Sequence, residues 1–522
     1  MVRISHLLSF ISSYFPFSGA KLDQFQNKPE HNNTLVISNF NEQSHISLIN
    51  HWNYHKDSKF NNWIENEIEF SHGNILLNIR NNDPSIIQDN FEPFENEIRP
   101  GVIIASSSRY KPNYFYQWTR DSAITALYLV SEGLQRNYTL YDNLVQDYIN
   151  NSYLLQRVNN PSGNFTPVDN WSGLGEPKFY CNNTQFNLNW GRPQTDGPGL
   201  RLISILTYLI NTDQPHQDLI LMNICQFDVK YIISHWNIAS FDPWEEVYSF
   251  HFFNNMVQLY GLKLYQYYFP TNPDYKQVVN TIQDIENFIT TYYVSKDLSL
   301  IIETPNLWDE RPSQVDIAVL IASLITHPVN PPIDVSMQFD TDNLLVLNVL
   351  YRLMQDMKPL YPINKNLHMG ENAAVALGRY PEDIYDGIDV SEGNPWFLAT
   401  CQGANILYRL VKSLEDKGMD LSVPLEQENF WYLFFKPYPT STYNELILPY
   451  QSLAFNETIK QILNIADGFI EIVRAHVNEQ GEMSEQFNKY SGYLTGATNL
   501  TWSYVEFINA ITARDNILDY YK

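Results

Sequence analysis

Apolar residues recur at intervals of three and four along much of this chain, the spacing that places them on one face of an α-helix. The clearest run has apolar side chains at Ile459, Ile462, Leu463, Ala466, Phe469, Ile470, Val473 and Val477. Other segments with helical character cover residues 60–80, 122–134, 197–210, 247–269, 315–326, 342–357, 395–414 and 500–514. With weaker segments included, the pattern predicts about twelve helices.

Strand-like alternation is sparse, and long loops with Gly, Pro and Trp separate the helical segments. No Ser/Thr-rich or Pro-rich linker divides residues 59–522, and no internal repeat is strong enough to indicate a solenoid. A chain of 522 residues can hold one to three domains. We therefore predict one large all-α domain over residues 59–522, with its function in the loops between helices.

The N-terminal 58 residues differ in character from the rest. Arg3 precedes a short apolar run and Ser18-Gly19-Ala20 fits a cleavage site, so residues 1–20 are predicted to be a secretory signal peptide. Residues 21–58 form a predicted polar extension. Secretion, or delivery to a vacuole, would also suit the N-x-S/T sequons, which begin at Asn32, Asn137, Asn150, Asn164, Asn170, Asn182, Asn456 and Asn499. The alternative is the mildly apolar start of a cytosolic protein.

Composition narrows the class of partner. Asp and Glu number 58 against 33 Lys and Arg, a formal charge of −25, which argues against nucleic acid or an anionic membrane because phosphates need a positive face. The 35 Tyr and 11 Trp can stack on sugar rings, although core packing accounts for most of them. Cys181, Cys225 and Cys401 allow at most one disulfide, and no Cys/His cluster predicts a metal site. We expect a monomer without cofactor or transmembrane helix.

The stretch SFDPWEEVYSFHFF, residues 240–253, places Asp242, Trp244, Glu245 and Glu246 at the predicted start of an apolar helix. Burial and a neighbouring negative charge both raise the pKa of a carboxyl group, so a Glu placed there can stay protonated and donate its proton. An acidic helix start that complements the helix dipole explains the same residues without any chemistry. Taken alone, that second interpretation is the stronger one.

Four further loop segments concentrate Trp, Tyr, Arg and carboxylates: PNYFYQWTRDS at 112–122, NWGRPQTDGPGLR at 189–201, GRYPEDIYDGIDVSEGNPWFLAT at 378–400 and GEMSEQFNKYSGYLTGATNLTWSY at 481–504. Helix caps, turns and ion pairs could account for each segment alone. Together they suggest cleavage of a glycosidic bond, which needs one protonated carboxyl group and a carboxylate on the far side of the sugar ring. No P-loop, G-x-G-x-x-G, H-E-x-x-H or G-x-S-x-G motif indicates another chemistry.

Five motifs in this order resemble glycoside hydrolase family 15, the glucoamylases, and most closely their secreted yeast type: QWTRDSA, WGRPQ-DGP, D-WEE, GRYPED with GNPWFLAT, and SEQ followed by LTWSY. The resemblance runs from residue 75 to residue 517. It implies an all-α (α/α)6 barrel of six inner and six outer helices, with the active site in interhelical loops at one end. It also implies inverting, exo-acting release of β-D-glucose from starch, glycogen and maltooligosaccharides, by cleavage of α-1,4 bonds and, more slowly, α-1,6 bonds.

The resemblance makes Glu245 the general acid and Glu485 the general base. Asp242 is a supporting or alternative acid, because an inverting base acts from the opposite face, with the carboxyl groups about 6.5–9.5 Å apart. The other predicted site residues bind substrate through hydroxyl contacts and aromatic walls; they are Tyr114, Trp118, Arg120, Asp121, Trp190, Arg192, Glu246, Arg379, Trp396 and Trp502.

The chain departs from the family pattern at three positions within the motifs. Pro243 replaces a usual Leu and should stiffen the approach to Glu245, while Asn113 and Asn499 stand where an acid is common. We expect the sequon at Asn499 to be unglycosylated, and we expect no starch-binding module. Two alternatives stay open: a dextran- or trehalose-type glucosidase on the same fold, and a non-catalytic glucan-binding protein.

Overall fold

The computed structural model describes residues 34–36, 58–92, 97–212, 217–366, 374–424, 429–435 and 444–521. The predicted signal peptide, most of the predicted extension and the sequon at Asn32 lie outside the described residues. Twelve helices of nine or more residues occur in the described part, as the hydrophobic pattern predicts. They are α2 (Ser58–Leu77), α3 (Thr119–Tyr128), α5 (Tyr138–Gln156), α6 (Asp196–Asn211), α8 (Gln226–His235), α9 (Phe252–Tyr268), α10 (Tyr275–Tyr292), α11 (Ala318–Thr326), α12 (Leu344–Leu360), α14 (Phe397–Lys417), α16 (Leu453–His476) and α17 (Thr501–Tyr520).

Six of these helices form a closed inner ring. Each of α3, α6, α9, α11, α14 and α17 packs against the next, and α17 packs against α3. All nine residues of α11 are buried, as is α6 from Asp196 to Leu209. A helix that is apolar on nearly every face belongs inside a protein, and these sequences fit that position.

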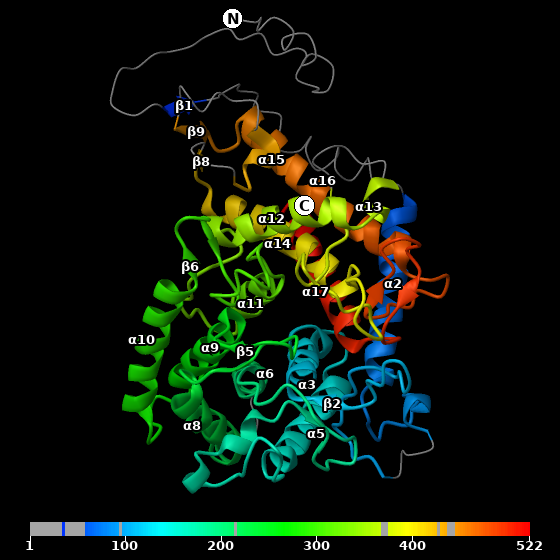
Figure 1. Cartoon of the computed structure of the whole chain (residues 1–522), viewed down its shortest axis with the longest axis vertical. Helices are drawn as coiled ribbons and strands as arrows, with labels where there is room; N and C mark the ends of the chain where they lie inside the picture. Colours follow the sequence, from blue (N-terminus) through cyan, green and yellow to red (C-terminus); the bar gives the residue numbers. More distant parts are fainter. Residues whose placement is uncertain are drawn as a thin grey trace, which may run out of the picture.

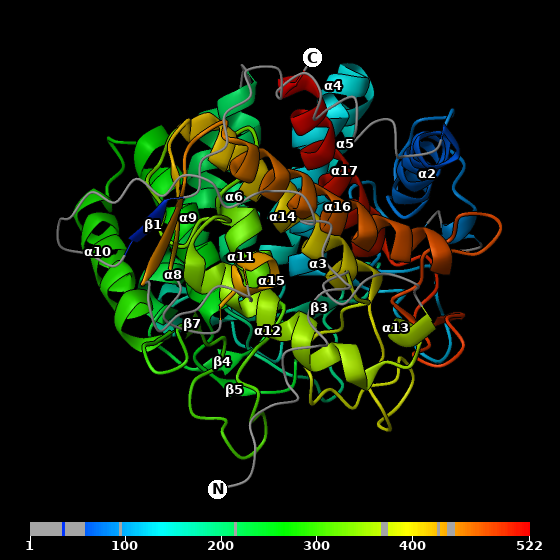
Figure 2. The same ribbon diagram turned by 90° about the horizontal axis from the view of Figure 1, so that it is seen from above.

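The other six helices cover the ring from outside. α2 packs on α17, α8 on α6, α10 on α9, α12 on α11 and α16 on α14, while α5 packs on the π-helical turn Leu129–Gly133 that continues α3. Burial is one-sided in α10, where the buried residues are Val278, Thr281, Ile282, Ile285 and Ile289. Figure 2 shows α2 and α10 at the periphery. The architecture is therefore the expected (α/α)6 barrel.

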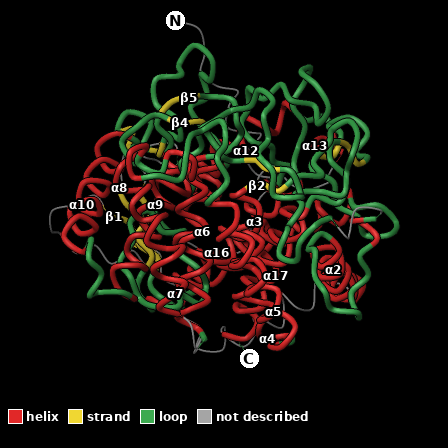
Figure 3. The backbone as a smooth tube through the Cα atoms, turned by 90° about the horizontal axis from the view of Figure 1, so that it is seen from below, coloured by secondary structure: helices red, strands yellow, loops and turns green. Residues whose placement is uncertain are grey.

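Long loops and short hairpins gather at one end of the barrel, with the C-terminus at the other end (Figure 3). Two-residue strands pair antiparallel there: β2 (Gln117–Trp118) with β3 (Lys178–Phe179), β4 (Ser240–Phe241) with β5 (Tyr248–Ser249), and β10 (Gln486–Phe487) with β11 (Leu494–Thr495). A further hairpin pairs β6 (Val294–Ser295) with β7 (Leu300–Ile301). The sheet of β1 (Thr34–Val36), β9 (Glu445–Leu448) and β8 (Leu421–Pro424) lies apart, at the top of Figure 1.

One predicted boundary is wrong in an instructive way. The helix expected from residue 247 begins at Phe252, and Val247 lies in the turn between β4 and β5. Glu245 is therefore not at a helix start, and the explanation by helix dipole does not apply to it. The hydrophobic pattern misleads because aromatic strand residues run directly into the helix.

Three smaller features concern the cysteines, the membrane and the sequon at Asn499. All three cysteines are buried and free. Among the described residues, no helix combines the length and apolarity needed to cross a lipid bilayer. Asn499 accepts a hydrogen bond from the Tyr504 hydroxyl at 2.6 Å and has a left-handed backbone with φ of 51°.

Candidate active site

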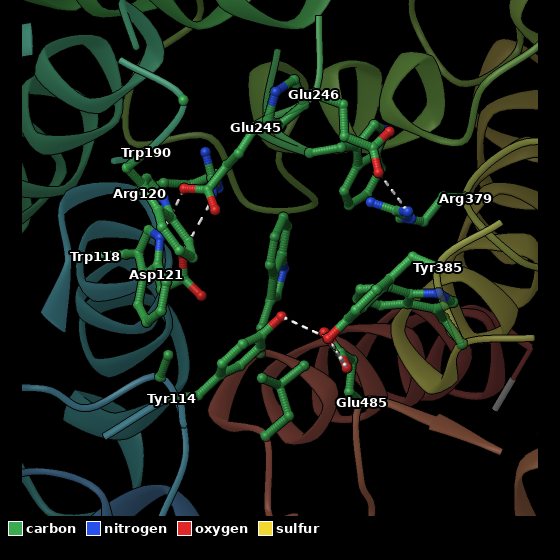
Figure 4. A pocket seen from close by; sticks show the side chains of 17 residues that line it. Tyr114, Trp118, Arg120, Asp121, Trp190, Glu245, Glu246, Arg379, Tyr385 and Glu485 are labelled. Carbon is green, nitrogen blue, oxygen red and sulfur yellow. Dashed lines mark hydrogen bonds and ion pairs between the residues drawn. The ribbon is translucent and has the colours of Figure 1, made fainter. Parts of the chain in front are cut away.

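The loops at one end of the barrel enclose a pocket of about 270 Å³. Of the thirteen predicted site residues, eleven line it: Tyr114, Trp118, Arg120, Asp121, Trp190, Glu245, Glu246, Arg379, Trp396, Glu485 and Trp502. They come from all five motifs, so the fold brings together segments that are far apart in the chain (Figure 4). Asp242 and Arg192 do not line the pocket.

Glu245 occupies a strained turn that the surrounding structure fixes. Its φ of 69° is left-handed, a conformation that costs a non-glycine residue on the order of 1–3 kcal/mol. The Oδ1 atom of buried Asp242 accepts hydrogen bonds from the backbone N–H groups of Glu246 at 2.7 Å and Val247 at 2.9 Å. Gly191 packs against the turn, where a Cβ atom would lie 2.6 Å from the Glu245 carbonyl oxygen. The turn is therefore held from both sides.

One oxygen of the Glu245 carboxyl group receives several donors. Its Oε1 atom accepts hydrogen bonds from Trp118 Nε1 at 2.7 Å and Gln194 Nε2 at 2.9 Å, and Arg120 lies 3.9 Å away. Arg120 in turn donates to Gln194 at 2.8 Å and to Asp196 at 3.0 Å. Among the described residues, no hydrogen bond to Glu245 Oε2 is found. The network thus fixes the carboxyl group through one oxygen.

Glu246, the next residue, is anchored through both oxygens. Arg379 donates to Oε1 at 2.7 Å, while Arg311 and the Tyr380 hydroxyl donate to Oε2 at 3.0 and 2.5 Å. Asp383 holds the Arg379 guanidinium with two hydrogen bonds of 2.8 and 2.6 Å. Two guanidinium groups therefore balance the charge of this carboxylate and set its orientation on the pocket wall.

Glu485 lies on the other side of the pocket, just before β10, and is 1% exposed. Burial raises the pKa of its carboxyl group to about 7, although a hydrogen bond from Tyr114 and the positive charge of Arg379 lower it. The Tyr385 hydroxyl lies 3.3 Å from Glu485 Oε2 and 3.0 Å from the Tyr114 hydroxyl. Gly496 permits this packing, because a Cβ atom there would meet Glu485 Oε2 at 2.5 Å.

Asp121 lies in the first turn of α3 beside Arg120 and also faces the pocket. Burial raises the pKa of its carboxyl group to about 6, and the neighbouring Arg120 guanidinium opposes that rise. The Nε of Arg120 lies 3.6 Å from Asp121 Oδ2. An anion and a cation thus stand side by side, which suits contacts to the hydroxyl groups of a neutral ligand.

Tryptophan rings form much of the pocket wall. Trp118 and Trp190 meet edge to face with centroids 6.1 Å apart, and Trp244 lies between Trp396 and Trp502 at 6.0 and 6.5 Å. The indole N–H groups of Trp190 and Trp396 are buried and lack a hydrogen-bond partner in the described part of the chain. The walls therefore offer aromatic ring surface, while these two N–H groups are enclosed behind it.

The two predicted residues outside the pocket hold the loops that form it. Arg192 donates to Glu176 at 3.1 Å and to the carbonyl oxygens of Leu188 and Phe186 at 2.9 and 3.1 Å. Asp242 caps the Glu245 turn from below and is fully buried. Neither side chain reaches the space where a ligand would lie.

Several residues that complete the site are not among the thirteen predicted ones. Tyr385 and Trp244 line the pocket, and they stand inside the quoted motifs together with Gln194, so position in a motif is an available signal for all three. Arg311 acts through contacts that no local pattern reveals. Lys178 is buried behind the wall with Nζ 3.5 Å from the centroid of the Trp190 ring, and burial lowers its pKa to about 7.

The described residues contain no group of three His, Cys, Asp or Glu side chains placed to hold a metal ion. What the pocket does present is two carboxyl groups on opposite sides, cationic clamps and aromatic walls (Figure 4). That arrangement can protonate a leaving oxygen on one side of a sugar and activate a water molecule on the other.

Comparison with known proteins gives a consistent result. The family model described as Glycosyl hydrolases family 15 matches residues 89–512. An intracellular sporulation-specific glucoamylase of Saccharomyces cerevisiae is 38% identical over 487 residues, which cover 88% of this chain and 85% of that protein. A glucoamylase of Saccharomycopsis fibuligera is 36% identical over 80% of this chain and 85% of its own length.

Solved structures agree with these sequence matches. The atomic-resolution structure of a glucoamylase from Saccharomycopsis fibuligera superposes with a TM-score of 0.78 at 33% identity, covering 88% of this chain and 96% of that one. The family 15 glucoamylase from Hypocrea jecorina has a TM-score of 0.75 at 28% identity, covering 88% of this chain and 73% of that one.

Proposed function

Because the chain belongs to the family 15 glycosyl hydrolases and is an enzyme of the glucoamylase type, we propose that it removes terminal α-1,4-linked glucose, and more slowly α-1,6-linked glucose, from non-reducing chain ends. The substrates are starch, glycogen and maltooligosaccharides, and the product is β-D-glucose. The observation that supports this proposal best is the position of Glu245 and Glu485 on opposite sides of one small pocket.

Glu245 acts as the general acid. Trp118 and Gln194 hold Oε1, so the proton resides on Oε2 and passes from there to the glycosidic oxygen. As the bond between that oxygen and the anomeric carbon breaks, the leaving oxygen keeps the bonding electrons and takes this proton. The strained backbone of Glu245 fits this role, since backbone strain of this kind clusters at active sites.

Glu485 acts as the general base. It accepts a proton from a water molecule whose oxygen attacks the anomeric carbon from the face opposite the leaving group, so the configuration inverts. A base must be ionised, whereas burial favours the protonated form of this carboxyl group. The hydroxyl groups of Tyr385 and Tyr114 and the charge of Arg379 favour ionisation and partly offset the effect of burial.

The remaining pocket residues bind the sugar. Arg120 and Asp121 hold the hydroxyl groups of the terminal glucose, and Glu246 with Arg379 holds hydroxyl groups near the scissile bond. The aromatic walls pack on the sugar rings. No cofactor enters this mechanism.

Asp242 and Arg192 have positioning roles in this proposal. Asp242 holds the backbone of the turn that carries Glu245, and lies beneath that turn rather than in the pocket. Arg192 ties together the loop that carries Trp190, through Glu176 and two carbonyl oxygens. The activating base is therefore Glu485 and not Asp242.

Replacing either carboxyl group tests the assignment. Glu245→Gln and Glu485→Gln should each lower kcat on maltooligosaccharides by at least about 10²-fold, the usual contribution of a positioned acid or base. Glu482→Gln makes the same chemical change three residues from Glu485, at a half-buried position outside the pocket, and should leave kcat unchanged. Near-full activity in either pocket variant would remove the role assigned to that residue. Dextran and trehalose, tested alongside, should be poor substrates.

Only the N-terminal sequence indicates the cellular location of the enzyme. We propose secretion, with a vacuole as the alternative, because residues 1–20 resemble a signal peptide. One relative is named as intracellular, so membership of the glucoamylase family does not by itself indicate the compartment. N-terminal sequencing of the native protein should find a chain that begins close to Lys21, and an intact N-terminus would contradict secretion by this route.

A further inference from the structure

A second and larger cavity, about 460 Å³ in volume, occupies the barrel at the end opposite the active site. All six inner helices contribute to its lining, with one residue from each being Tyr128, Thr207, Tyr260, Leu324, Gln402 and Glu506. The active-site pocket instead uses the first residues of inner helices, such as Arg120 and Asp121 of α3. We call this second cavity the lower lumen. It is outside the proposed catalytic machinery.

The lower lumen contains buried polar atoms without partners. The Tyr260 hydroxyl and the side-chain oxygen of Gln402 are buried, and neither has a hydrogen-bond partner among the described residues. Both side chains line the cavity. Buried polar atoms are normally paired, because leaving one unpaired is costly. Both atoms are enclosed rather than exposed to the cavity, so an occupant that donates and accepts hydrogen bonds pairs with them only after these lining side chains turn toward it.

The charged groups of the lining are already engaged. Arg409 donates to Asn405 Oδ1 at 2.9 Å and to the Leu324 carbonyl oxygen at 3.0 Å. Glu506 accepts hydrogen bonds from Trp502 Nε1 at 2.7 Å and Asn509 Nδ2 at 3.2 Å. Because both side chains are hydrogen-bonded within the protein, the neutral groups of the lining are the ones left to contact a ligand.

The third charged group, Glu132, is half-buried and interacts with the Thr512 side chain. Apolar side chains complete the walls, among them Ile124, Ile203 and Leu324. Apolar walls with scattered neutral donors and acceptors are typical of sites for small uncharged molecules that carry both C–H faces and hydroxyl groups.

We propose that the lower lumen is a second binding site, for a neutral polyhydroxylated molecule of the size of a mono- or disaccharide. The site is coupled to the catalytic end through one residue pair. Trp502 lines the active-site pocket, and its indole N–H donates to Glu506, which lines the lower lumen. A molecule that contacts Glu506 therefore acts on the same hydrogen bond that orients an active-site wall.

Binding can be measured with the active site blocked. The protein is saturated with acarbose, a pseudo-oligosaccharide inhibitor expected to fill the catalytic pocket, and D-glucose, maltose and glycerol are titrated in turn by ligand-observed NMR. At least one of the two sugars should bind saturably to the blocked protein, and a crystal structure with that sugar should place it in the lower lumen. No binding to the blocked protein, or glycerol binding alone, would overturn the proposal.

Two variants test the location. Tyr260→Phe removes a hydroxyl group that has no partner within the described chain, so it should fold normally and weaken sugar binding about tenfold, equivalent to ~1.4 kcal/mol. Ser131→Trp places a large ring in the lining and should abolish binding, whereas Asn143→Trp, at an exposed position outside the lining, should not. Equal sugar affinity in all three variants would also overturn the proposal. Failure of acarbose itself to bind would instead count against the proposed hydrolytic function.

Discussion

At the scale of single residues, hydrogen bonding distinguishes the two carboxyl groups that we propose to be catalytic. Glu245 accepts hydrogen bonds from Trp118 and Gln194 on one oxygen, which leaves the other oxygen to carry the proton in the proposed mechanism. Glu485 is more deeply enclosed, and its Oε2 atom lies 3.3 Å from the Tyr385 hydroxyl. Two carboxyl groups of the same kind can therefore have different roles because their surroundings differ.

The raised pKa of Glu485 predicts a pH dependence. A general base acts in its ionised form, and that fraction falls as pH falls through the pKa, which burial raises to about 7. The value of kcat/KM should therefore decline on the acid side with a midpoint above the ordinary Glu value of 4.5. Tyr385→Phe removes a donor that favours the ionised form, so it should move the midpoint to still higher pH.

A matched variant shows whether the shift of the pH midpoint is specific to Tyr385 or follows from the loss of any tyrosine hydroxyl group. Tyr490→Phe removes an exposed hydroxyl that donates to Glu392, away from the pocket, and should leave the pH profile unchanged. A parent midpoint at or below 4.5, or the same midpoint in Tyr385→Phe, would contradict the role given to Glu485 and its tyrosine neighbour.

At the scale of helices, close backbone contact keeps the inner ring tight. A Cβ atom on Gly199 of α6 would lie 3.0 Å from the backbone nitrogen of Gln258 in α9. On the same interface, a Cβ atom on Gly261 would lie 3.1 Å from the Gly199 carbonyl oxygen. These two glycines allow α6 and α9 to approach one another closely.

Enlarging one of these glycines should loosen the ring. Gly199→Val forces the α6 and α9 backbones apart, and overpacking of this kind costs about 1–3 kcal/mol of unfolding free energy. Gly73→Val is the matched control, because no atom lies within 4 Å of a Cβ atom at that position in α2. Thermal unfolding should show a clearly lower Tm for the first variant than for the second. Equal Tm values would show that the close contact of α6 and α9 at Gly199 does not determine stability.

Local patterns predict the helices well because burial is one-sided in helices such as α10 and nearly continuous in α6 and α11. The spacing from Ile459 to Val473 matches the buried face of α16. The start of α9 was mispredicted because the turn before it depends on hydrogen bonds to the Asp242 side chain. Hydrogen bonds to such a side chain leave no trace in the hydrophobic pattern. The turn before α9 is therefore visible only in the folded structure.

Motifs indicate which residues meet, but not which of them touch a substrate. Arg192 stands in a motif and was predicted to bind substrate, while the structure places it against Glu176, outside the pocket. Tyr385 also stands in a motif, and its contact with Glu485 joins residues that are 100 positions apart. Contacts of this kind depend on the closure of the barrel, which no local stretch of sequence encodes.

At the scale of the whole molecule, the barrel has two different ends. Loops and short hairpins form the catalytic end, and the lower lumen opens among the far ends of the inner helices. Trp502 and Glu506, one turn apart on α17, join the two. The net charge of −25 suits a protein whose substrates are neutral glucans, because no phosphate or other anion has to be attracted.

The stereochemistry of the product tests the account most directly. Maltooligosaccharides are hydrolysed in an NMR tube, and the anomeric proton signals of glucose are followed before mutarotation equilibrates them. Attack by water from the Glu485 side, opposite the leaving group protonated by Glu245, predicts that β-D-glucose appears first. Initial release of α-D-glucose would contradict the proposed division of labour between Glu245 and Glu485.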